Sequence, residues 1–310
     1  MRRVLLTGGA GFMGSQVLRD LVAAGCEVVV LDKLTYAGRR AHIEGVPCSL
    51  VVGDVCDPGA VRDAMRGCDA VVHAAAESHV ARSLGAPAGF LRTNVEGTRV
   101  VLESAVALGV ERVLHVSTDE VFGQVGDGIA CDVDAPMRPG NAYAASKVGA
   151  EALVHAWRHT HGLPTVIVRC TNNYGPRQHP EKAVPCWAMA ALAGEAMPID
   201  GDGSAVRDWL FVEDLSRGLV AALLRWTPGA TWHFAGQQHR TNHEMASAVA
   251  RSAGETPRFA RRPERQGQDR RYALADAQTR RALGWAPRVS LEDGLAITVA
   301  WYRAHRDAWA

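Results

Sequence analysis

The chain has 310 residues, 47% of them hydrophobic, and a formal net charge of +1 at pH 7. This neutral balance lacks the basic surface on which nucleic-acid binding depends, so we expect no nucleic-acid partner. No apolar run is long enough to span a membrane, and glycines interrupt the apolar N-terminal stretch too early for a signal peptide, so we expect a cytoplasmic protein with no membrane partner.

The seven cysteines are odd in number and form no CxxC pair. This pattern is typical of reduced, mostly buried thiols in a cytoplasmic protein. A redox or metal-binding role is the alternative, but no spacing of the cysteines supports it, and we expect no metal.

Strand-like and helix-like segments alternate through the first half of the chain. Patterns of helical period lie between the apolar runs, and repeated units of this kind predict an α/β fold with a doubly wound parallel sheet. The apolar runs are nearly continuous, which is typical of strands covered on both faces. The runs lie at 3–8, 27–32, 49–54, 69–76, 111–118 and 164–171. The helical patterns lie at 15–24, 59–66, 89–108 and 142–161.

The alternation loosens after about residue 171, where proline, glycine and charged residues become denser. The segment 258–271 is strongly basic, and the tail 291–309 again has helical period. We therefore predict a nucleotide-binding half followed by a smaller and more irregular half.

A glycine-rich turn connects the first predicted strand with the first predicted helix. Its spaced glycines are Gly8, Gly11 and Gly14. Such glycines let the backbone approach a pyrophosphate, which the free N–H groups and the positive end of the helix bind. Asp32 ends the second predicted strand, where a carboxylate binds the adenine ribose and repels a 2′-phosphate. Arg39 and Arg40 favour NADP, but the place of Asp32 at the strand end favours NAD.

A tyrosine and a lysine lie four residues apart in the helical pattern 142–161, so they share one face of the helix. These residues are Tyr143 and Lys147. A neighbouring ammonium group and a positively charged nicotinamide ring both favour the phenolate, which then takes a proton from a sugar hydroxyl. Only three of the 34 basic residues are lysine, which favours a specific role for Lys147 over an ordinary surface charge. The other two lysines are Lys33 and Lys182.

Two adjacent carboxylates follow the predicted strand 111–118. The stretch HVSTDEVFG places Ser117 and Thr118 directly before Asp119 and Glu120. One interpretation is a polar turn that caps the next element. The other is a site that handles two protons.

Together these motifs resemble the extended short-chain dehydrogenase/reductases. Further stretches make the chain similar to nucleoside-diphosphate-glucose 4,6-dehydratases, above all those acting on dTDP-glucose. The resemblance spans nearly the whole chain, and the pair of carboxylates is its most specific part, because simple epimerases lack it. The stretches lie at 32–38, 73–83, 117–123, 172–182, 201–214 and 269–274.

The resemblance implies a Rossmann domain over 1–170, with a returning segment near 208–236, and a smaller α+β nucleotide-sugar-binding domain over 171–310. It implies a homodimer formed through the helical patterns 89–108 and 142–161. It also implies a lyase that oxidises the sugar at C4, eliminates water across C5 and C6, and returns the hydride to C6.

The resemblance assigns roles to five catalytic residues. Asp119 is the acid that protonates the leaving C6 hydroxyl, and Glu120 is the base that takes the C5 proton. Thr118 hydrogen-bonds the C4 hydroxyl or the phenol. Tyr143 and Lys147 carry out the oxidation with NAD, which stays bound through the cycle.

The cofactor and substrate contacts are expected in two sets. A nucleotide diphosphate requires cations and amide donors, which Arg207, Asn173 and Lys182 offer; a salt bridge between Arg207 and Asp208 is the alternative for that arginine. The cofactor set is Gly8, Gly11, Phe12, Met13, Gly14, Asp32, Lys33, Asp54, Val55, Ala74, Ala75, Ala76, Asn94, Tyr143 and Lys147. The substrate set is Ser78, His79, Thr118, Asn173, Glu181, Lys182, Arg207 and Gln268.

Four positions depart from the family pattern. Phe234 stands in place of an asparagine and Gln268 in place of a histidine, both at positions expected near the nucleotide, while Ala81 replaces an aspartate and Phe122 a tyrosine. These departures favour, as an alternative, a related dehydratase that acts on another nucleotide sugar or stops at a 5,6-unsaturated product. An epimerase leaves both carboxylates idle, and a non-catalytic NAD-binding regulator leaves the whole catalytic set idle.

Overall fold

A seven-stranded parallel sheet forms the larger part of the computed structural model, which describes residues 2–306. The order β10-β6-β5-β4-β1-β2-β3 reverses between β1 and β4, so the chain winds outward from the centre in both directions. The prediction of a doubly wound α/β fold is confirmed. The strands are β1 (Arg3–Thr7), β2 (Glu27–Asp32), β3 (Ser49–Val52), β4 (Ala70–His73), β5 (Arg112–Thr118), β6 (Thr165–Cys170) and β10 (Thr231–Phe234).

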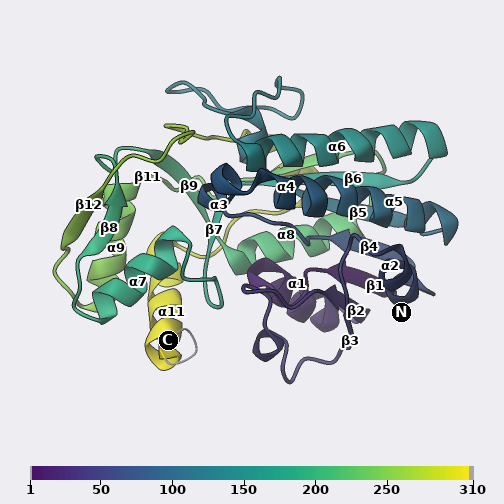
Figure 1. Cartoon of the computed structure of the whole chain (residues 1–310), viewed down its shortest axis with the longest axis horizontal. Helices are drawn as coiled ribbons and strands as arrows, with labels where there is room; N and C mark the ends of the chain where they lie inside the picture. Colours follow the sequence, from purple (N-terminus) through teal and green to yellow (C-terminus); the bar gives the residue numbers. More distant parts are fainter. Residues whose placement is uncertain (1, 307–310) are drawn as a thin grey trace.

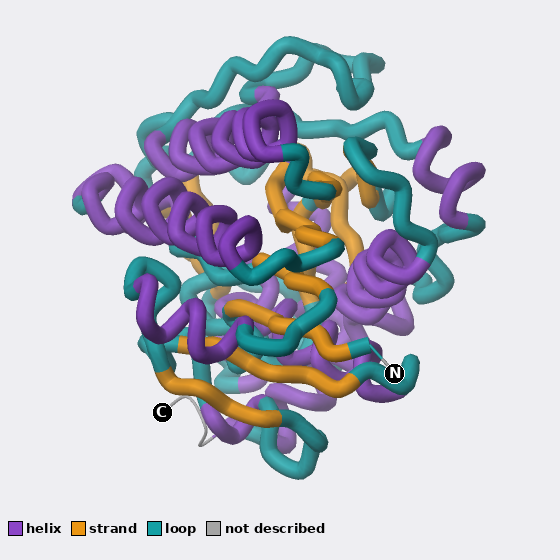
Figure 2. The backbone as a smooth tube through the Cα atoms, turned by 90° about the vertical axis from the view of Figure 1, so that its right-hand side faces the viewer, coloured by secondary structure: helices purple, strands orange, loops and turns teal. Residues whose placement is uncertain are grey.

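Helices cover both faces of this sheet, as the view in Figure 2 shows. Alternate side chains of β1 enter two different cores: Val4 and Leu6 pack with the helices of one face, and Leu5 packs with those of the other. One face carries α1 (Phe12–Ala23) and α8 (Val212–Leu224). The other carries α2 (Pro58–Met65), α5 (Gly97–Ala107) and α6 (Ala142–His161).

The helical pattern at 89–108 does not form one continuous α-helix. It is divided into α4 (Pro87–Phe90), a π-helical segment (Leu91–Glu96) and α5. The extra residue in a π turn shifts the helix face, and such turns are frequent at functional sites. Here the π-helical segment turns the side chain of Asn94 toward the interior. The short helix α3 (Val80–Gly85) precedes α4.

The remaining elements form a smaller part on the left of Figure 1, beside the large sheet. It contains a three-stranded sheet, β11-β9-β7, and a pair of parallel strands, β12-β8. Its core is formed by side chains of β7, β8, β9, α7, α9 and α11. The strands are β7 (Asn172–Tyr174), β8 (Met197–Asp200), β9 (Val206–Phe211), β11 (His239–Thr241) and β12 (Phe259–Arg262). The helices are α7 (Ala183–Leu192), α9 (Asn242–Ala253) and α11 (Leu291–Ala304), whereas α10 (Ala277–Leu283) packs against β10 and α8 of the larger half.

The chain returns to the large sheet after leaving it. The strand β10 pairs with β6 in parallel, and α8 packs against α1, so part of the segment 208–236 belongs to the larger half. The division into 1–170 and 171–310 stays a prediction. The tail helix ends at Ala304, earlier than residue 309, and positions 307–309 of the predicted helix lie outside the described residues.

All seven cysteines carry free thiols; three of them are buried and four are partly buried. Within residues 2–306, no helix is both long and apolar enough to cross a membrane. No cluster of three or more His, Cys, Asp or Glu side chains suited to a metal ion occurs in the same part of the chain.

Candidate active site and cofactor cleft

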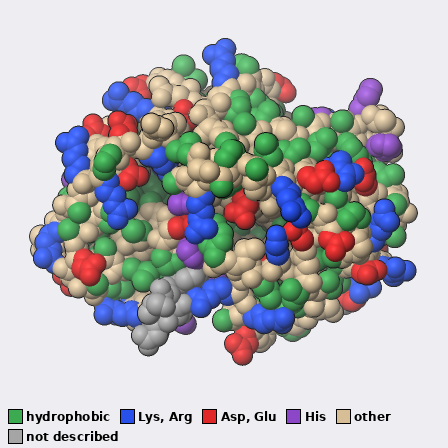
Figure 3. Space-filling view, in the orientation of Figure 1, with side chains coloured by type: hydrophobic (Ala, Val, Ile, Leu, Met, Phe, Trp, Pro, Cys, Tyr) green, Lys and Arg blue, Asp and Glu red, His purple; other side chains and the backbone are tan. Residues whose placement is uncertain are grey.

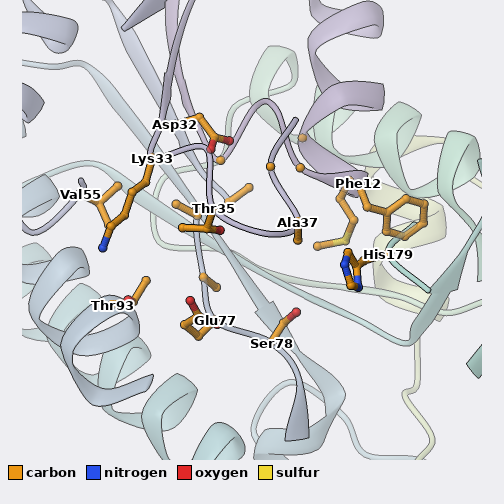
Figure 4. A pocket seen from close by; sticks show the side chains of 18 of the residues that line it. Phe12, Asp32, Lys33, Thr35, Ala37, Val55, Glu77, Ser78, Thr93 and His179 are labelled. Carbon is orange, nitrogen blue, oxygen red and sulfur yellow. The ribbon is translucent and has the colours of Figure 1, made fainter. Parts of the chain in front are cut away.

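A cleft opens at the carboxyl ends of the central strands, where β1, β2, β4 and β5 lead into loops. Ligands of doubly wound sheets bind at this edge, next to the point where the strand order reverses. In Figure 4, Asp32 and Lys33 lie toward one end of the cleft, and Ser78 and His179 toward the other. Histidine and charged side chains also gather near the middle of the face in Figure 3.

The glycine-rich turn is closed so tightly that two of its glycines admit no side chain. A Cβ at Gly14 would lie 2.0 Å from the main-chain oxygen of Gly8, and one at Gly8 would lie 2.8 Å from the Cα of Ala75. Gly8 also has a φ of +72°, which favours glycine. Gly11 provides no side-chain cap for α1, so the first N–H groups of this helix are available to an anion.

Asp32 is held at the end of β2 by main-chain donors. Its Oδ2 accepts from Ala10 N at 2.9 Å, and its Oδ1 accepts from Leu34 N at 2.8 Å. A Cβ at Gly38 would lie 2.6 Å from the same Oδ1, so the following loop closes directly over the carboxylate. This placement fits recognition of a ribose diol. Neither of the two arginines at positions 39 and 40 is among the described residues that line the cleft.

Tyr143 and Lys147 lie on one face of α6, both buried and both lining the cleft. The helix begins with a cap, because Asn141 Oδ1 accepts from Ala144 N at 2.9 Å. Burial lowers the pKa of Lys147 to about 8. Burial raises the pKa of Tyr143 well above its ordinary value, and the charge of Glu120 adds to this shift. The phenolate that the sequence led us to expect is therefore disfavoured by the protein groups alone.

The stretch of two carboxylates begins at the end of β5 and continues into a 3₁₀ turn (Asp119–Phe122). Thr118 caps this turn, since its Oγ1 accepts from Glu120 N at 3.2 Å, and it also donates to Asp119 Oδ1 at 3.2 Å. The capping interpretation is therefore correct for Thr118, but it does not account for Asp119. That carboxyl is buried, and its Oδ2 has no partner in the described part of the chain.

Asp119 is placed to act as an acid. Burial raises its pKa well above the ordinary value, and the neighbouring charge of Glu120 raises it further. A carboxyl group in this environment holds its proton to a higher pH than an exposed aspartate does. Asp119, the proposed proton donor, thus lies next to the half-buried carboxylate of Glu120 directly after the end of β5.

Glu120 has two side-chain partners that sequence reasoning did not single out. Its Oε2 lies 3.3 Å from Asn141 Nδ2 and 3.4 Å from the hydroxyl of Tyr272. Tyr272 belongs to the stretch 269–274, which carries part of the family resemblance. That stretch was the one feature of the sequence that could have pointed to this tyrosine. For Asn141, the sequence indicated only that an asparagine two residues before Tyr143 could cap the helix.

The structure brings fourteen of the fifteen predicted cofactor residues to the cleft; the exception is Asn94. Its amide is used inside the protein: Oδ1 accepts from Glu77 N at 2.9 Å, and Nδ2 donates to Glu77 O and to Ser146 Oγ. Asn94 therefore supports the cleft wall and the helix that carries Tyr143. Direct contact with the cofactor is not supported for this residue.

The predicted substrate residues divide into two groups. Ser78, Glu181 and Lys182 line the cleft. Lys182 Nζ donates to Ser78 O at 2.7 Å, and burial lowers its pKa. Glu181 lies 2.9 Å from Arg82 Nε and 3.5 Å from His79 Nδ1. The remaining predicted residues lie outside the lining of this cleft: His79, Thr118, Asn173, Arg207 and Gln268.

Arg207 makes no salt bridge with Asp208, contrary to the alternative considered from sequence. Its terminal nitrogens donate to the main-chain oxygens of Val206, Asp269 and Arg270. Asp208 instead accepts from the main-chain N–H groups at 236 and 238, at 2.9 and 2.7 Å. The aspartate therefore organises a loop, because buried carboxylates require donors and main-chain amides supply them here.

Phe234 is a core residue that does not line the cleft, so its expected place beside the nucleotide stays a prediction. It is fully buried, its ring is 4.7 Å from that of Trp285, and a Cβ at Gly218 would lie 2.4 Å from it. An aromatic residue here is part of the hydrophobic core. Phe122 is likewise buried, with the guanidinium of Arg169 over its ring at 4.8 Å.

Comparison with known proteins places the chain in a family. Residues 4–233 match the model of the NAD dependent epimerase/dehydratase family. The chain belongs to this family. A dTDP-glucose 4,6-dehydratase from Streptomyces niveus is 42% identical over 99% of this chain and 94% of its own length. The dTDP-glucose 4,6-dehydratase DesIV from Streptomyces venezuelae, solved with NAD and TYD bound, is 43% identical, with a TM-score of 0.96 over 99% of this chain and 98% of that one.

The fold alone does not separate the activities within the family. A UDP-glucose 4-epimerase from Thermus thermophilus, solved with NAD, is 34% identical and has a TM-score of 0.91 over 97% of this chain and 99% of that one. Dehydratases and epimerases thus share one scaffold, and function must be argued from the site. In this chain the site includes a buried Asp119 beside Glu120, the pair that the resemblance associates with dehydratases.

The residues present fit a dinucleotide. The turn at Gly8 and Gly14 has no room for side chains, so a ligand can approach its main chain. The first N–H groups of α1 have no side-chain cap, and Asp32 lies at the end of the neighbouring strand. These are the features that bind a pyrophosphate and an adenine ribose. The same cleft continues to Tyr143 and Lys147.

Proposed function

We propose that the protein is an NAD-dependent 4,6-dehydratase of nucleotide sugars, with dTDP-glucose as its substrate. It oxidises the sugar at C4, removes water across C5 and C6, and reduces C6, so that the product is the 4-keto-6-deoxy sugar. The observation that carries the proposal is the buried Asp119 with its raised pKa, adjacent to Glu120. Neither carboxylate lines the cleft itself, but Ser117 does, and the charges of Glu120 and Asp119 both act on Tyr143. An elimination uses an acid and a base in addition to the oxidising pair.

The cofactor is held by the glycine-rich turn, Asp32 and the loops after β3 and β4. When bound, NAD supplies the acceptor for the C4 hydrogen and later the donor for C6. Lys147 anchors the site, because its Nζ donates to Val116 O at 2.7 Å and carries a charge next to Tyr143. Tyr143 takes the proton of the C4 hydroxyl, and Thr118 orients that hydroxyl or the phenol.

The two carboxylates then perform opposite proton transfers. A C4 ketone acidifies the C5 hydrogen, and Glu120 takes this proton. Asp119, whose pKa burial raises, protonates the C6 hydroxyl so that it leaves as water. Their environments differ in the required sense, because Asp119 is fully buried whereas Glu120 is half-exposed.

The nucleotide sugar lies beyond the nicotinamide end of the cleft. Ser78, Glu181 and Lys182 face this space. We assign contacts with the sugar and the diphosphate to them and to the nearby residues His79, Asn173, Arg207 and Gln268. In the structure the terminal nitrogens of Arg207 are engaged with main-chain oxygens, so contact of this arginine with a phosphate requires a change of partner.

A panel of dTDP-, UDP-, CDP- and GDP-glucose, scored by mass spectrometry of the products, tests the assignment. A dehydratase produces a nucleotide sugar lighter by one water, and we expect the highest kcat/KM with the dTDP sugar. An enzyme that returns the hydride to C4 and stops at a 5,6-unsaturated sugar gives a product of the same mass, which NMR separates by an exocyclic methylene in place of the C6 methyl group. An epimer of unchanged mass, or no product with any sugar, contradicts the proposal.

We further propose that the protein is a homodimer that pairs through α5 and α6 and works in the cytoplasm. Leu91 is 51% exposed and Leu84 is 44% exposed near this face. Exposed alanines of α6, such as Ala152, allow helices to approach closely. The free thiols fit a reducing compartment. Sedimentation velocity checks the dimer, and Ala152→Arg is expected to yield a monomer; a wild-type monomer contradicts this part.

A further inference from the structure

A buried tyrosine hydroxyl lies between two carboxylates at the edge of the active site. The hydroxyl of Tyr272 lies 2.7 Å from Asp269 Oδ2 and 3.4 Å from Glu120 Oε2. The side chain of Tyr272 is 3% exposed, whereas Asp269 and Glu120 are both half-exposed. A chain of three oxygen-bearing groups thus runs from the proposed base to the other side of Tyr272.

Several segments of the chain hold the side chain of Tyr272 in place. The guanidinium of Arg207 lies 4.6 Å from the centre of the Tyr272 ring. The same guanidinium donates to the main-chain oxygens of Asp269 and Arg270, which fixes the segment that carries the tyrosine. On the other side, a Cβ at Gly140 would lie 2.9 Å from Asp269 Oδ1, so the loop before α6 packs directly against this carboxylate.

Tyr272 has one proton to share between two acceptors. The shorter distance assigns this proton to Asp269, which leaves the phenolic oxygen turned toward Glu120 as an acceptor. Burial raises the pKa of Tyr272 well above its ordinary value, with the charge of Glu120 adding to the shift. The tyrosine therefore cannot act as a base, but it can accept one proton while it releases another.

We propose that Tyr272 and Asp269 form a proton relay that connects Glu120 with solvent. This inference rests on the proposed dehydratase function, in which Glu120 takes the C5 proton. When the C5–H bond breaks, its electron pair stays on the sugar and the proton binds a Glu120 oxygen. Glu120 then donates to the Tyr272 oxygen as Tyr272 passes its own proton to Asp269. The net change is one proton moved from Glu120 to Asp269, from which it exchanges with water.

The relay determines the source of the hydrogen at C5 of the product. With the relay, Glu120 is refilled with a solvent proton before C5 is reprotonated. Without it, Glu120 keeps the proton that it removed and returns the same one. Glu120 takes up one proton and gives back one proton in each cycle with or without the relay. Turnover is therefore expected to continue when the relay is broken.

The test uses dTDP-glucose deuterated at C5, turned over in ordinary water, with the C5 position of the product read by NMR. The wild-type product is expected to carry mainly solvent hydrogen. Tyr272→Phe keeps the buried ring and removes only the hydroxyl, so the deuterium retained at C5 is expected to rise several-fold while kcat falls less than tenfold. Asp269→Asn removes the final proton acceptor and is expected to raise retention in the same direction.

Tyr174→Phe is the matched control, because Tyr174 is a similarly buried tyrosine in the smaller half. Its product is expected to match that of wild type. Equal retention in wild type and Tyr272→Phe overturns the relay, since Glu120 then exchanges directly with water. Complete retention in wild type also overturns it. If wild type removes no water from the sugar, the proposed function fails as well, and the product mass reveals this separately from the label.

Discussion

The ammonium group of Lys147 donates to the main-chain oxygen of Val116 at 2.7 Å. This bond connects α6 with β5 two residues before Thr118, so the helix with the proposed oxidising pair is held to the strand that leads into the proposed acid. Both residues of the bond lie in the wall of the cofactor cleft. The charge on Lys147 is consequently part of the site, although burial makes that charge unfavourable.

The activity is expected to fall as the pH rises through about 8, the lowered pKa of Lys147, because the ammonium charge is then lost. The effect on stability has the opposite sign. Between about 8 and the ordinary value of 10.5 the unfolded chain binds more protons than the folded one, so the free energy of unfolding rises with pH in this window. A kcat–pH profile of wild type and Lys147→Arg checks the assignment, since arginine keeps its charge and removes this step. An unchanged step in Lys147→Arg contradicts it.

Tyr143→Phe is expected to lower kcat by about 10²–10⁴-fold, the usual cost of losing a general base. The phenyl ring keeps the packing against Phe90, whose ring centre is 6.4 Å away, so the fold and the cofactor content remain. Steady-state kinetics and the amount of NAD released on denaturation measure the two effects. Near-normal turnover would show that Tyr143 is not the base.

Glu120→Gln is expected to stop elimination after oxidation at C4, because an amide cannot accept the C5 proton. Exchange of the C5 hydrogen with D₂O becomes far slower than in wild type. Asp119→Asn is expected to differ, with C5 exchange continuing while the loss of water slows. NMR of the recovered sugar and mass spectrometry of quenched reactions separate the two variants. Water loss at the normal rate in Glu120→Gln would show that the two carboxylates are only a helix cap and a surface charge. The dehydratase assignment then fails.

Asp119→Asn is also expected to stabilise the protein at neutral pH. The folded state holds the Asp119 proton above the pH at which the unfolded chain releases it, so this carboxyl lowers the free energy of unfolding as the pH rises above about 4. A neutral amide avoids that cost, so the variant is expected to unfold at a higher urea concentration than wild type, by a margin that grows with pH. Urea unfolding from pH 5 upward measures it. A gain that is largest at the acidic end contradicts the raised pKa.

Gly14→Ala is expected to abolish the copurification of NAD. The added Cβ would lie 2.0 Å from the oxygen of Gly8, so the turn must open and the phosphate-binding geometry is lost. Gly89→Ala is the matched control, because a Cβ there meets no atom within 4 Å. Cofactor is identified after denaturation by chromatography. Release of NADP from wild type contradicts the role of Asp32, and equal NAD in both variants contradicts the role of the turn.

The sequence by itself determined six of the seven strands of the large sheet, the turn at Gly8–Gly14 and the residues to which we assign the chemistry. The six predicted strands and the helix at 142–161 were found, because burial on both faces of a strand and the helical period both leave a local pattern. The four-residue spacing indicated the Tyr–Lys pair, the stretch after the fifth strand indicated the two carboxylates, and the family resemblance then assigned roles to these carboxylates. These features depend on residues close together in the chain, which is why they are readable without a structure.

Tertiary structure decided which of these residues meet and in what environment. Tyr272 reaches Glu120 across 152 positions of sequence, and no local pattern reports such a contact. The π-helical segment that turns Asn94 inward, the loop contacts of Asp208 and the core position of Phe234 likewise depend on packing. The raised pKa of Asp119 follows from the same cause, because the cost of a charge is set by burial, and burial is a property of the assembled fold.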